Sequence, residues 1–154
     1  MDFTLKTLPP IRLAYLRVTG PYGSARIPHA WQRFAAWCSA RALHGVLYGL
    51  ALDDPMKTTP TSCRYDCCVA VEDDFKPDGE FAAQTFTGGR FVCSRFVGTP
   101  NNINKAWVEM FTQLPLNGYH ALGRPAVEVY ERGSAADPKS GTFSCLLCVP
   151  VKLT

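Results

Sequence analysis

Hydrophobic and polar positions along the chain fall into two halves with the same order of elements. In the first half, apolar and β-branched segments bounded by Gly, Pro and Asp predict strands. These strands cover residues 3–8, 11–19, 46–52 and 64–71. Between the second and third strands, Pro28 suits the first turn of a helix, and Trp31, Phe34 and Cys38 follow at helical spacing. We expect this helix to end at Gly45.

The second half repeats that order. The predicted strands cover residues 81–86, 90–97, 126–131 and 142–151. After the second of them, Asn101 or Asn102 is expected to cap a helix, because both are strong N-cap residues. Trp107 and Phe111 lie on the apolar stripe of that helix.

Three landmarks support an internal duplication. Segment 13–20 resembles segment 91–98, Trp31 corresponds to Trp107, and segment 68–71 resembles 148–151, all at offsets of 76 to 80 residues. We therefore interpret residues 1–154 as one domain built from two repeats, about 3–71 and 81–151.

The repeat predicts an α+β fold. Each repeat is a β-α-β-β unit with a leading strand before it, and such a unit is too thin to stand alone. We expect the two units to pair their first strands about a pseudo-twofold axis. The result would be one antiparallel sheet carrying two helices with a central groove between them, where a small molecule would bind.

Composition narrows the class of protein. The chain has 154 residues, of which 47% are hydrophobic and 19% charged, as in a soluble globular domain. Its net charge of +3 is scattered, so we expect no direct contact with nucleic acid. No signal peptide or membrane span is evident. Seven cysteines, two of them adjacent, make a poor disulfide framework and indicate a cytoplasmic protein.

Catalytic and cofactor motifs are missing from the sequence. It contains no G-x-S-x-G, no nucleotide-binding glycine loop and no H-E-x-x-H, and its three histidines are isolated. Cys145 and Cys148 have C-x-x-C spacing, but strand residues three apart point to opposite faces. We predict core packing for these cysteines, and neither a metal nor a cofactor.

Two carboxylates stand in apolar strands. Alternation places Glu128 and Tyr130 on one face and the flanking valines on the other. Glu128 then faces either water or the groove, and the pattern alone favours water. In the groove it would attract a cationic ligand or have a raised pKa. Asp66 poses the same question, with an ion pair to Arg64 as the simpler alternative.

Aromatic side chains supply candidate groove walls. Tyr22 follows the turn at Gly20, and Trp107 lies near the start of its helix, so both are placed to line the mouth of a cleft. Aromatic faces bind flat or cationic organic molecules. Ordinary core packing is the alternative for each.

Six short motifs occur in the order typical of one family. They are Gly-Pro-Tyr at 20–22, Leu-Asp-Asp-Pro at 52–55, Cys-Arg-Tyr-Asp at 63–66, Gly-Gly-Arg-Phe at 88–91, the Trp107 helix, and Arg-Pro-Ala-Val-Glu-Val-Tyr at 124–130. In these motifs the sequence resembles the gyrase-inhibitor-like (GyrI-like, or SbmC) family, which shares its fold with the effector-binding domains of AraC-type and MerR-type regulators.

The resemblance implies a function as well as a fold. The groove of this family binds hydrophobic, often cationic or planar compounds, and a strand glutamate forms a recurrent polar contact. Glu128 and Tyr130 match that strand, which favours the groove over solvent for Glu128. Stand-alone members inhibit DNA gyrase and protect against toxins. Because no helix-turn-helix precedes the first strand, we do not expect a transcription factor.

Three hypotheses follow, and they leave the oligomeric state open. The first is a small-molecule-binding module in which Glu128 supplies the counter-charge. Its other predicted ligand-binding residues are Tyr22, Tyr48, Asp66, Trp107, Phe111 and Tyr130. The second is a hydrolase of cyclopropane-bearing alkylators, with Glu128 as general base and Tyr130 or Trp107 orienting the substrate. The third is a protein inhibitor of DNA gyrase, although a net charge of +3 opposes simple mimicry of DNA.

Overall fold

The computed structural model describes residues 1–123, 125–131 and 139–152. The first half contains β1 (Thr4–Leu8), β2 (Ile11–Thr19), α1 (Arg26–Ala40), β3 (Leu47–Ala51) and β4 (Arg64–Ala70), with a 3-10 turn at Pro60–Ser62. The second half contains β5 (Ala82–Phe86), β6 (Gly89–Gly98), α2 (Pro100–Leu116), β7 (Ala126–Tyr130) and β8 (Phe143–Pro150). The predicted order of elements is confirmed, and each half has a leading strand.

All eight strands form one antiparallel sheet in the order β1-β6-β8-β7-β3-β4-β2-β5. Equivalent strands of the two halves lie at equal distances from the centre, where β3 pairs with β7. The expectation that β2 and β6 pair at the axis is wrong. The leading strands instead exchange halves, since β1 pairs with β6 and β5 pairs with β2.

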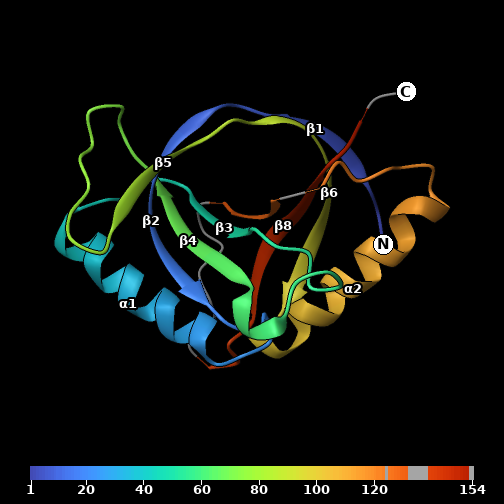
Figure 1. Cartoon of the computed structure of the whole chain (residues 1–154), viewed down its shortest axis with the longest axis horizontal. Helices are drawn as coiled ribbons and strands as arrows, with labels where there is room; N and C mark the ends of the chain where they lie inside the picture. The colour runs from blue at the N-terminus through green and yellow to red at the C-terminus, as the bar shows by residue number, and fades with distance from the viewer. Residues whose placement is uncertain (124, 132–138, 153–154) are drawn as a thin grey trace.

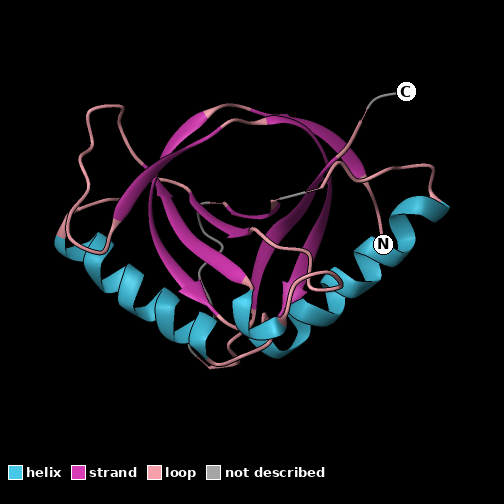
Figure 2. Ribbon diagram, in the orientation of Figure 1, coloured by secondary structure: helices cyan, strands magenta, loops and turns pink. Residues whose placement is uncertain are grey.

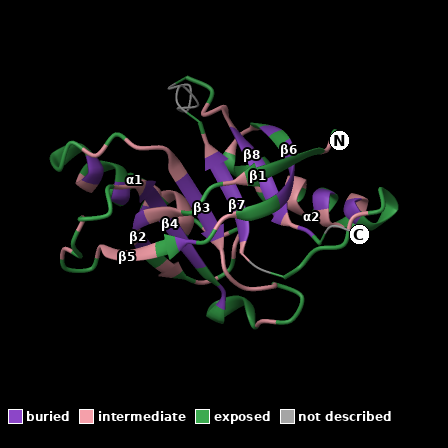
Figure 3. Ribbon diagram, turned by 90° about the horizontal axis from the view of Figure 1, so that it is seen from above, coloured by how far each residue is buried: buried purple, intermediate pink, exposed green. Residues whose placement is uncertain are grey.

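The sheet curls, so both of its faces bury side chains. Both helices cover its outer face, while β1 and β5 arch over the opposite side (Figures 1 and 2). The inner face holds a hydrophobic cluster that includes Leu13, Tyr48, Phe86, Phe91 and Val127. The central strands are accordingly buried, whereas β1 is largely exposed (Figure 3).

Each helix packs an apolar stripe on its own half of the outer face. Ala30, Phe34 and Cys38 of α1 join one cluster, and Met110 and Leu114 of α2 join the other. None of the helices in the described ranges is both long and apolar enough to cross a membrane.

Two predicted helix ends need correction. Helix α1 stops at Ala40 rather than at Gly45, because Ala42 adopts a φ of 54° and reverses the chain. Helix α2 is capped by Thr99, whose side chain and that of Asn102 form a capping box. Asn102 therefore supports the cap from the third helical position.

The connection between β1 and β2 and the connection between β5 and β6 touch at Gly88. This residue has a φ of +70°, and a side chain there would collide with the backbone of the 8–10 segment. Only glycine adopts this positive φ without strain and has no side chain to collide with the neighbouring backbone. Gly88 thus lets the chain close the curled sheet.

Candidate functional site

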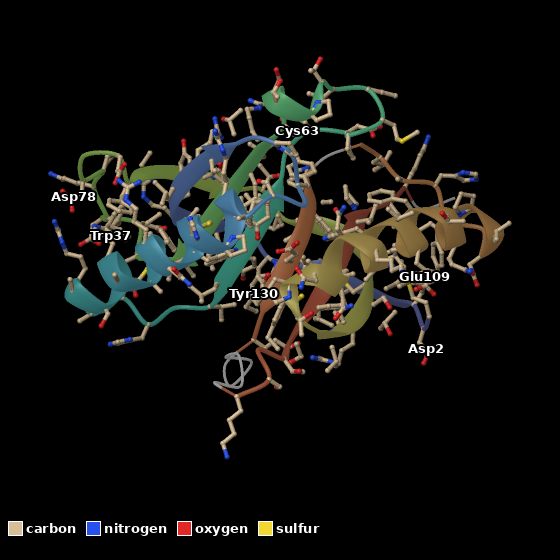
Figure 4. The ribbon with its side chains drawn as sticks, turned by 90° about the horizontal axis from the view of Figure 1, so that it is seen from below. Asp2, Trp37, Cys63, Asp78, Glu109 and Tyr130 are labelled. Carbon is tan, nitrogen blue, oxygen red and sulfur yellow. The ribbon has the colours of Figure 1, made fainter. Side chains whose placement is uncertain are left out.

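A groove of about 1720 Å³ lies between α1 and α2 above the centre of the sheet. Its floor comes from β3, β4 and β7, and its walls come from the facing sides of the two helices. Tyr130 lies between the helices in the view of Figure 4. The volume exceeds the roughly 300–1,000 Å³ of most small-molecule pockets, so a large organic ligand fits.

Glu128 lies on the floor of the groove, where β3 and β7 pair, and is only 6% exposed. Its Oε1 accepts hydrogen bonds from the hydroxyls of Tyr65 at 2.6 Å and Tyr130 at 2.7 Å. Its Oε2 accepts one from Trp107 Nε1 at 3.0 Å. Three protein donors therefore hold the carboxylate in place.

The two repeats contribute one tryptophan each to this network. Trp31 of α1 donates its indole N–H to the Tyr65 hydroxyl at 3.0 Å, and Trp107 of α2 donates directly to Glu128. Trp31 also meets the Tyr130 ring edge-on, with ring centroids 5.4 Å apart. The network thus joins both helices to the floor of the groove.

Gly49 provides the space that the carboxylate occupies. It lies directly opposite Glu128 in the β3–β7 pair, so the same position across the pseudo-twofold axis carries glycine in one half and glutamate in the other. A Cβ atom on Gly49 would lie 2.6 Å from Glu128 Oε1 and would overlap the Tyr65 hydroxyl. The groove accommodates the Glu128 carboxylate because the equivalent position in the first repeat, Gly49, has no side chain.

Burial governs the protonation of the network. Desolvation raises the pKa of Glu128, and the hydrogen bonds from Tyr65, Trp107 and Tyr130 oppose that rise. Burial, together with the charge of Glu128, raises the pKa values of Tyr65 and Tyr130 well above their ordinary value. Both phenols consequently remain protonated donors at neutral pH.

The groove is more acidic than the protein as a whole. Among its described lining residues are the carboxylates of Asp54, Glu128 and Glu131, against one lysine, Lys57, and one histidine, His44. Within the described ranges, Glu128 forms no ion pair with a lysine or arginine. Its negative charge is held by neutral hydrogen-bond donors.

The sequence of residues 1–152 matches the family model described as the GyrI-like small molecule binding domain. The chain belongs to the GyrI-like family. This GyrI-like domain is 25% identical over 152 residues to DNA gyrase inhibitor 2 of Dickeya dadantii (strain 3937), covering 93% of this chain and 90% of that protein.

Solved structures share the fold. The C-terminal domain of EcmrR superposes with a TM-score of 0.76 at 19% identity, covering 99% of this chain and 98% of that one. Against EcmrR in its DNA complex, the GyrI-like chain spans 58% of the other chain. SAV2435 bound to tetraphenylphosphonium gives a TM-score of 0.66 at 16% identity, with 99% and 94% of the two chains covered.

Five predicted site residues line the groove of the GyrI-like domain. They are Tyr22, Trp107, Phe111, Glu128 and Tyr130. The expectation from pattern alone, that Glu128 faces water, is wrong. Tyr22 lines the groove with its ring, while its hydroxyl donates to the Arg64 carbonyl at 2.8 Å and fixes the loop after β3.

Tyr48 and Asp66 lie elsewhere, which corrects the prediction for both. Tyr48 is 8% exposed and belongs to the inner-face cluster, because neighbouring Leu47 and Gly49 take the groove side of β3. Asp66 is fully buried and pairs with Arg17, whose Nε lies 2.8 Å from Oδ1, and not with Arg64.

Arg64 instead pairs with Asp53 in the loop after β3. Gln84 Nε2 also donates to Asp66 at 2.9 Å, so the buried Asp66 carboxylate is held on the side of the sheet away from the groove residue Tyr65.

Sequence reasoning missed Tyr65, Trp31 and Gly49. Successive side chains in a strand point to opposite faces of the sheet, so only one of Tyr65 and Asp66 faces the groove. Trp31 was detectable as the repeat equivalent of Trp107. Nothing in the local sequence marks Gly49, since its role depends on which strand pairs with β7. No metal-binding group occurs among the residues that the structure describes.

Proposed function

We propose that this GyrI-like domain binds bulky hydrophobic cations in the groove between α1 and α2, with Glu128 as counter-charge. One observation carries the proposal. Glu128 is a buried carboxylate that receives hydrogen bonds from three neutral donors and no ion pair within the described ranges. A charge in that setting attracts a cation much more strongly than it would in water.

The walls suit a cation whose charge is spread over an apolar surface. Trp31, Trp107, Phe111 and Tyr130 line the same groove as the carboxylate, and aromatic faces attract cations as well as apolar groups. Because the protein already donates three hydrogen bonds to Glu128, the ligand need not donate one. Quaternary phosphonium and ammonium ions meet this description, and the fold neighbour SAV2435 is bound to tetraphenylphosphonium.

Hydrolysis is the second candidate, since the raised pKa of Glu128 suits a general base. A base needs a lone pair directed at water, whereas Oε1 already accepts two hydrogen bonds and Oε2 one. This arrangement favours binding over turnover. Mass spectrometry of a cyclopropane-bearing alkylator after incubation with the protein tests the alternative, because ring opening would add one water.

The proposal is tested by calorimetric titration with tetraphenylphosphonium and with neutral triphenylphosphine oxide. In Glu128→Gln we expect the Kd for the cation to rise by at least about tenfold, the loss of roughly 1.4 kcal/mol. The neutral compound should bind the two proteins within about twofold of each other. The matched control is Glu131→Gln, which removes an equal charge from an exposed, Arg95-paired position of the same groove.

If Glu128→Gln and Glu131→Gln lose equal affinity for the cation, the effect comes only from the overall charge of the groove. That result would overturn the role of Glu128 as counter-charge. If no titration shows binding, a supercoiling assay with DNA gyrase becomes decisive, because a relative is named DNA gyrase inhibitor 2.

We place the function in the cytoplasm, since the seven cysteines are free thiols suited to a reducing compartment.

A further inference from the structure

Two cysteines face each other across neighbouring strands on the inner face of the sheet. Cys93 of β6 and Cys148 of β8 are direct partners in the antiparallel register. Directly opposite residues in such a pair have Cα atoms about 4.5–5.5 Å apart, within the 4.4–6.8 Å that a disulfide spans. Their Sγ atoms are in contact at 2.7 Å.

The other strand cysteines lack such a partner. Within the described pairings, Cys67 lies opposite Leu16 and Gly49, and Cys68 lies opposite Tyr15 and Tyr48. Cys145 lies opposite Phe96. One pair of thiols is therefore set apart by register from the remaining strand cysteines.

The surroundings distinguish the two sulfurs. The hydrogen bond between the two sulfurs lowers the pKa of Cys93, burial opposes that change, and the positive charge of Lys6 on β1 assists it. The same contact raises the pKa of Cys148. Cys93 therefore loses its proton more readily than Cys148 and is the better nucleophile of the pair.

The pair lies close to an edge of the sheet, because β6 is the neighbour of the edge strand β1. Cys93 pairs with Thr4 of this edge strand, in which the first four of five residues are exposed. Both cysteines are at most 2% exposed, so the oxidant must be small.

We propose that Cys93 and Cys148 form an oxidation site that hydrogen peroxide converts to an intramolecular disulfide. The Cys93 thiolate attacks one peroxide oxygen, the O–O bond breaks, and the departing hydroxide takes a proton to become water. The Cys148 sulfur then attacks the sulfur of the Cys93 sulfenic acid. The S–S bond forms and a second water leaves with the Cys148 proton. Two thiols are oxidised and one peroxide is reduced to two waters.

The test is differential alkylation of the reduced, full-length protein before and after exposure to hydrogen peroxide. After oxidation of the folded protein, we expect its mass, measured under denaturing conditions, to be about 2 Da lower. We also expect digestion to yield one cross-linked peptide that contains Cys93 and Cys148. The melting temperature should rise by about 10 °C, because the bond closes a loop between residues 55 positions apart, and dithiothreitol should reverse it.

Cys148→Ala should abolish the cross-link. The matched control is Cys68→Ala, at the repeat-equivalent position, which is also fully buried but faces tyrosines. It should retain the cross-link. Peptide mapping of the wild-type protein decides the matter even if a variant fails to fold. A disulfide at another pair, or oxygen added to Cys93 without a cross-link, overturns the proposal.

Discussion

At the scale of single residues, the site depends on an asymmetry between two equivalent positions. Gly49 and Glu128 face each other where β3 and β7 pair. Two glutamates there would place like charges side by side in a buried setting, and two glycines would leave no charge. The duplicated fold therefore offers one place on its axis where a single carboxylate can be buried with donors from both halves.

Replacing Gly49 by alanine should disrupt this arrangement. The new Cβ would lie 2.6 Å from Glu128 Oε1 and 2.8 Å from Tyr65 Cζ, so the network must shift. We expect chemical denaturation to show a loss of about 1–3 kcal/mol in the free energy of unfolding, as for overpacked cores. Binding of tetraphenylphosphonium should weaken at the same time.

The matched control is Gly23→Ala, at the rim of the same groove. Its nearest neighbour, Asn104 Nδ2, would lie an ordinary 3.6 Å away. We expect its stability and affinity to match those of the wild type. If Gly49→Ala binds and unfolds like this control, the close fit around Glu128 is not required.

The raised pKa of Glu128 predicts how affinity depends on pH. A cation prefers the ionised carboxylate, so its affinity should increase as the pH rises through the raised pKa of Glu128 and should level off above it. The neutral compound should bind independently of pH. Calorimetric titrations of the wild type and Glu128→Gln check this, and a pH dependence retained in Glu128→Gln would assign it to another group.

Stability of the ligand-free protein should respond in the opposite sense. A carboxyl group whose pKa is raised by folding binds more protons in the native state than in the unfolded chain. Its contribution is present below its ordinary pKa of 4.5 and is lost as the pH rises through the raised value. The melting temperature of the wild type relative to Glu128→Gln should therefore fall over that interval.

At the scale of elements, the two helices are anchored differently. Trp37 of α1 stacks on Phe81 at 4.2 Å and donates its indole N–H to Asp78, both in the segment that joins the halves. Arg41 also pairs with Asp78. Figure 4 shows Trp37 beside Asp78 at the side of α1. The repeat-equivalent position on α2 is Gln113, so this anchor belongs to α1.

Trp37→Ala should lower the free energy of unfolding by about 2–3 kcal/mol, because a large aromatic contact is lost. Since Trp37 is not among the described residues lining the groove, the Kd for tetraphenylphosphonium should stay within about twofold. Trp37→Phe keeps an aromatic ring at this position but removes the N–H donor to Asp78 and part of the stacked indole surface, so it should cost less than Trp37→Ala. Denaturation curves and titrations of both variants compare the two effects, and a large loss of affinity in Trp37→Ala would contradict the separation of this anchor from the groove.

The elements themselves were predicted well because each has a strong local signal. Strand β2 matches its predicted range of 11–19, and the other strands match within about two residues. Helix ends were less accurate. Ala42 adopts a left-handed conformation that glycine usually occupies, so the sequence did not indicate a turn there. The cap of α2 is Thr99, whereas the sequence favoured the two asparagines that follow it.

At the scale of the whole molecule, the halves are more interlocked than two adjoining units. Each leading strand pairs with a strand of the other half, and the connections cross where Gly88 approaches the 8–10 segment. The result is a curved sheet with a core on its inner face and two helices on its outer face (Figure 1). The groove lies on the pseudo-twofold axis that this arrangement creates.

The sequence by itself determined the duplication and the order of strands and helices. These follow from local periodicity and from similarity between segments, which need no knowledge of distant contacts. The strand pattern alone favoured water for Glu128, and only the family resemblance favoured the groove. Alternation within a strand also separates Tyr65 from Asp66, but it cannot say which face lies under the helices, because both faces of a curled sheet are buried.

The tertiary structure alone decided which residues meet. Tyr65 and Glu128 are 63 positions apart and Trp107 and Glu128 are 21 apart, and no local pattern links them. The same holds for Cys93 and Cys148, 55 positions apart. Strand order and register bring these side chains together, since hydrogen bonding between distant strands fixes which residues stand opposite each other.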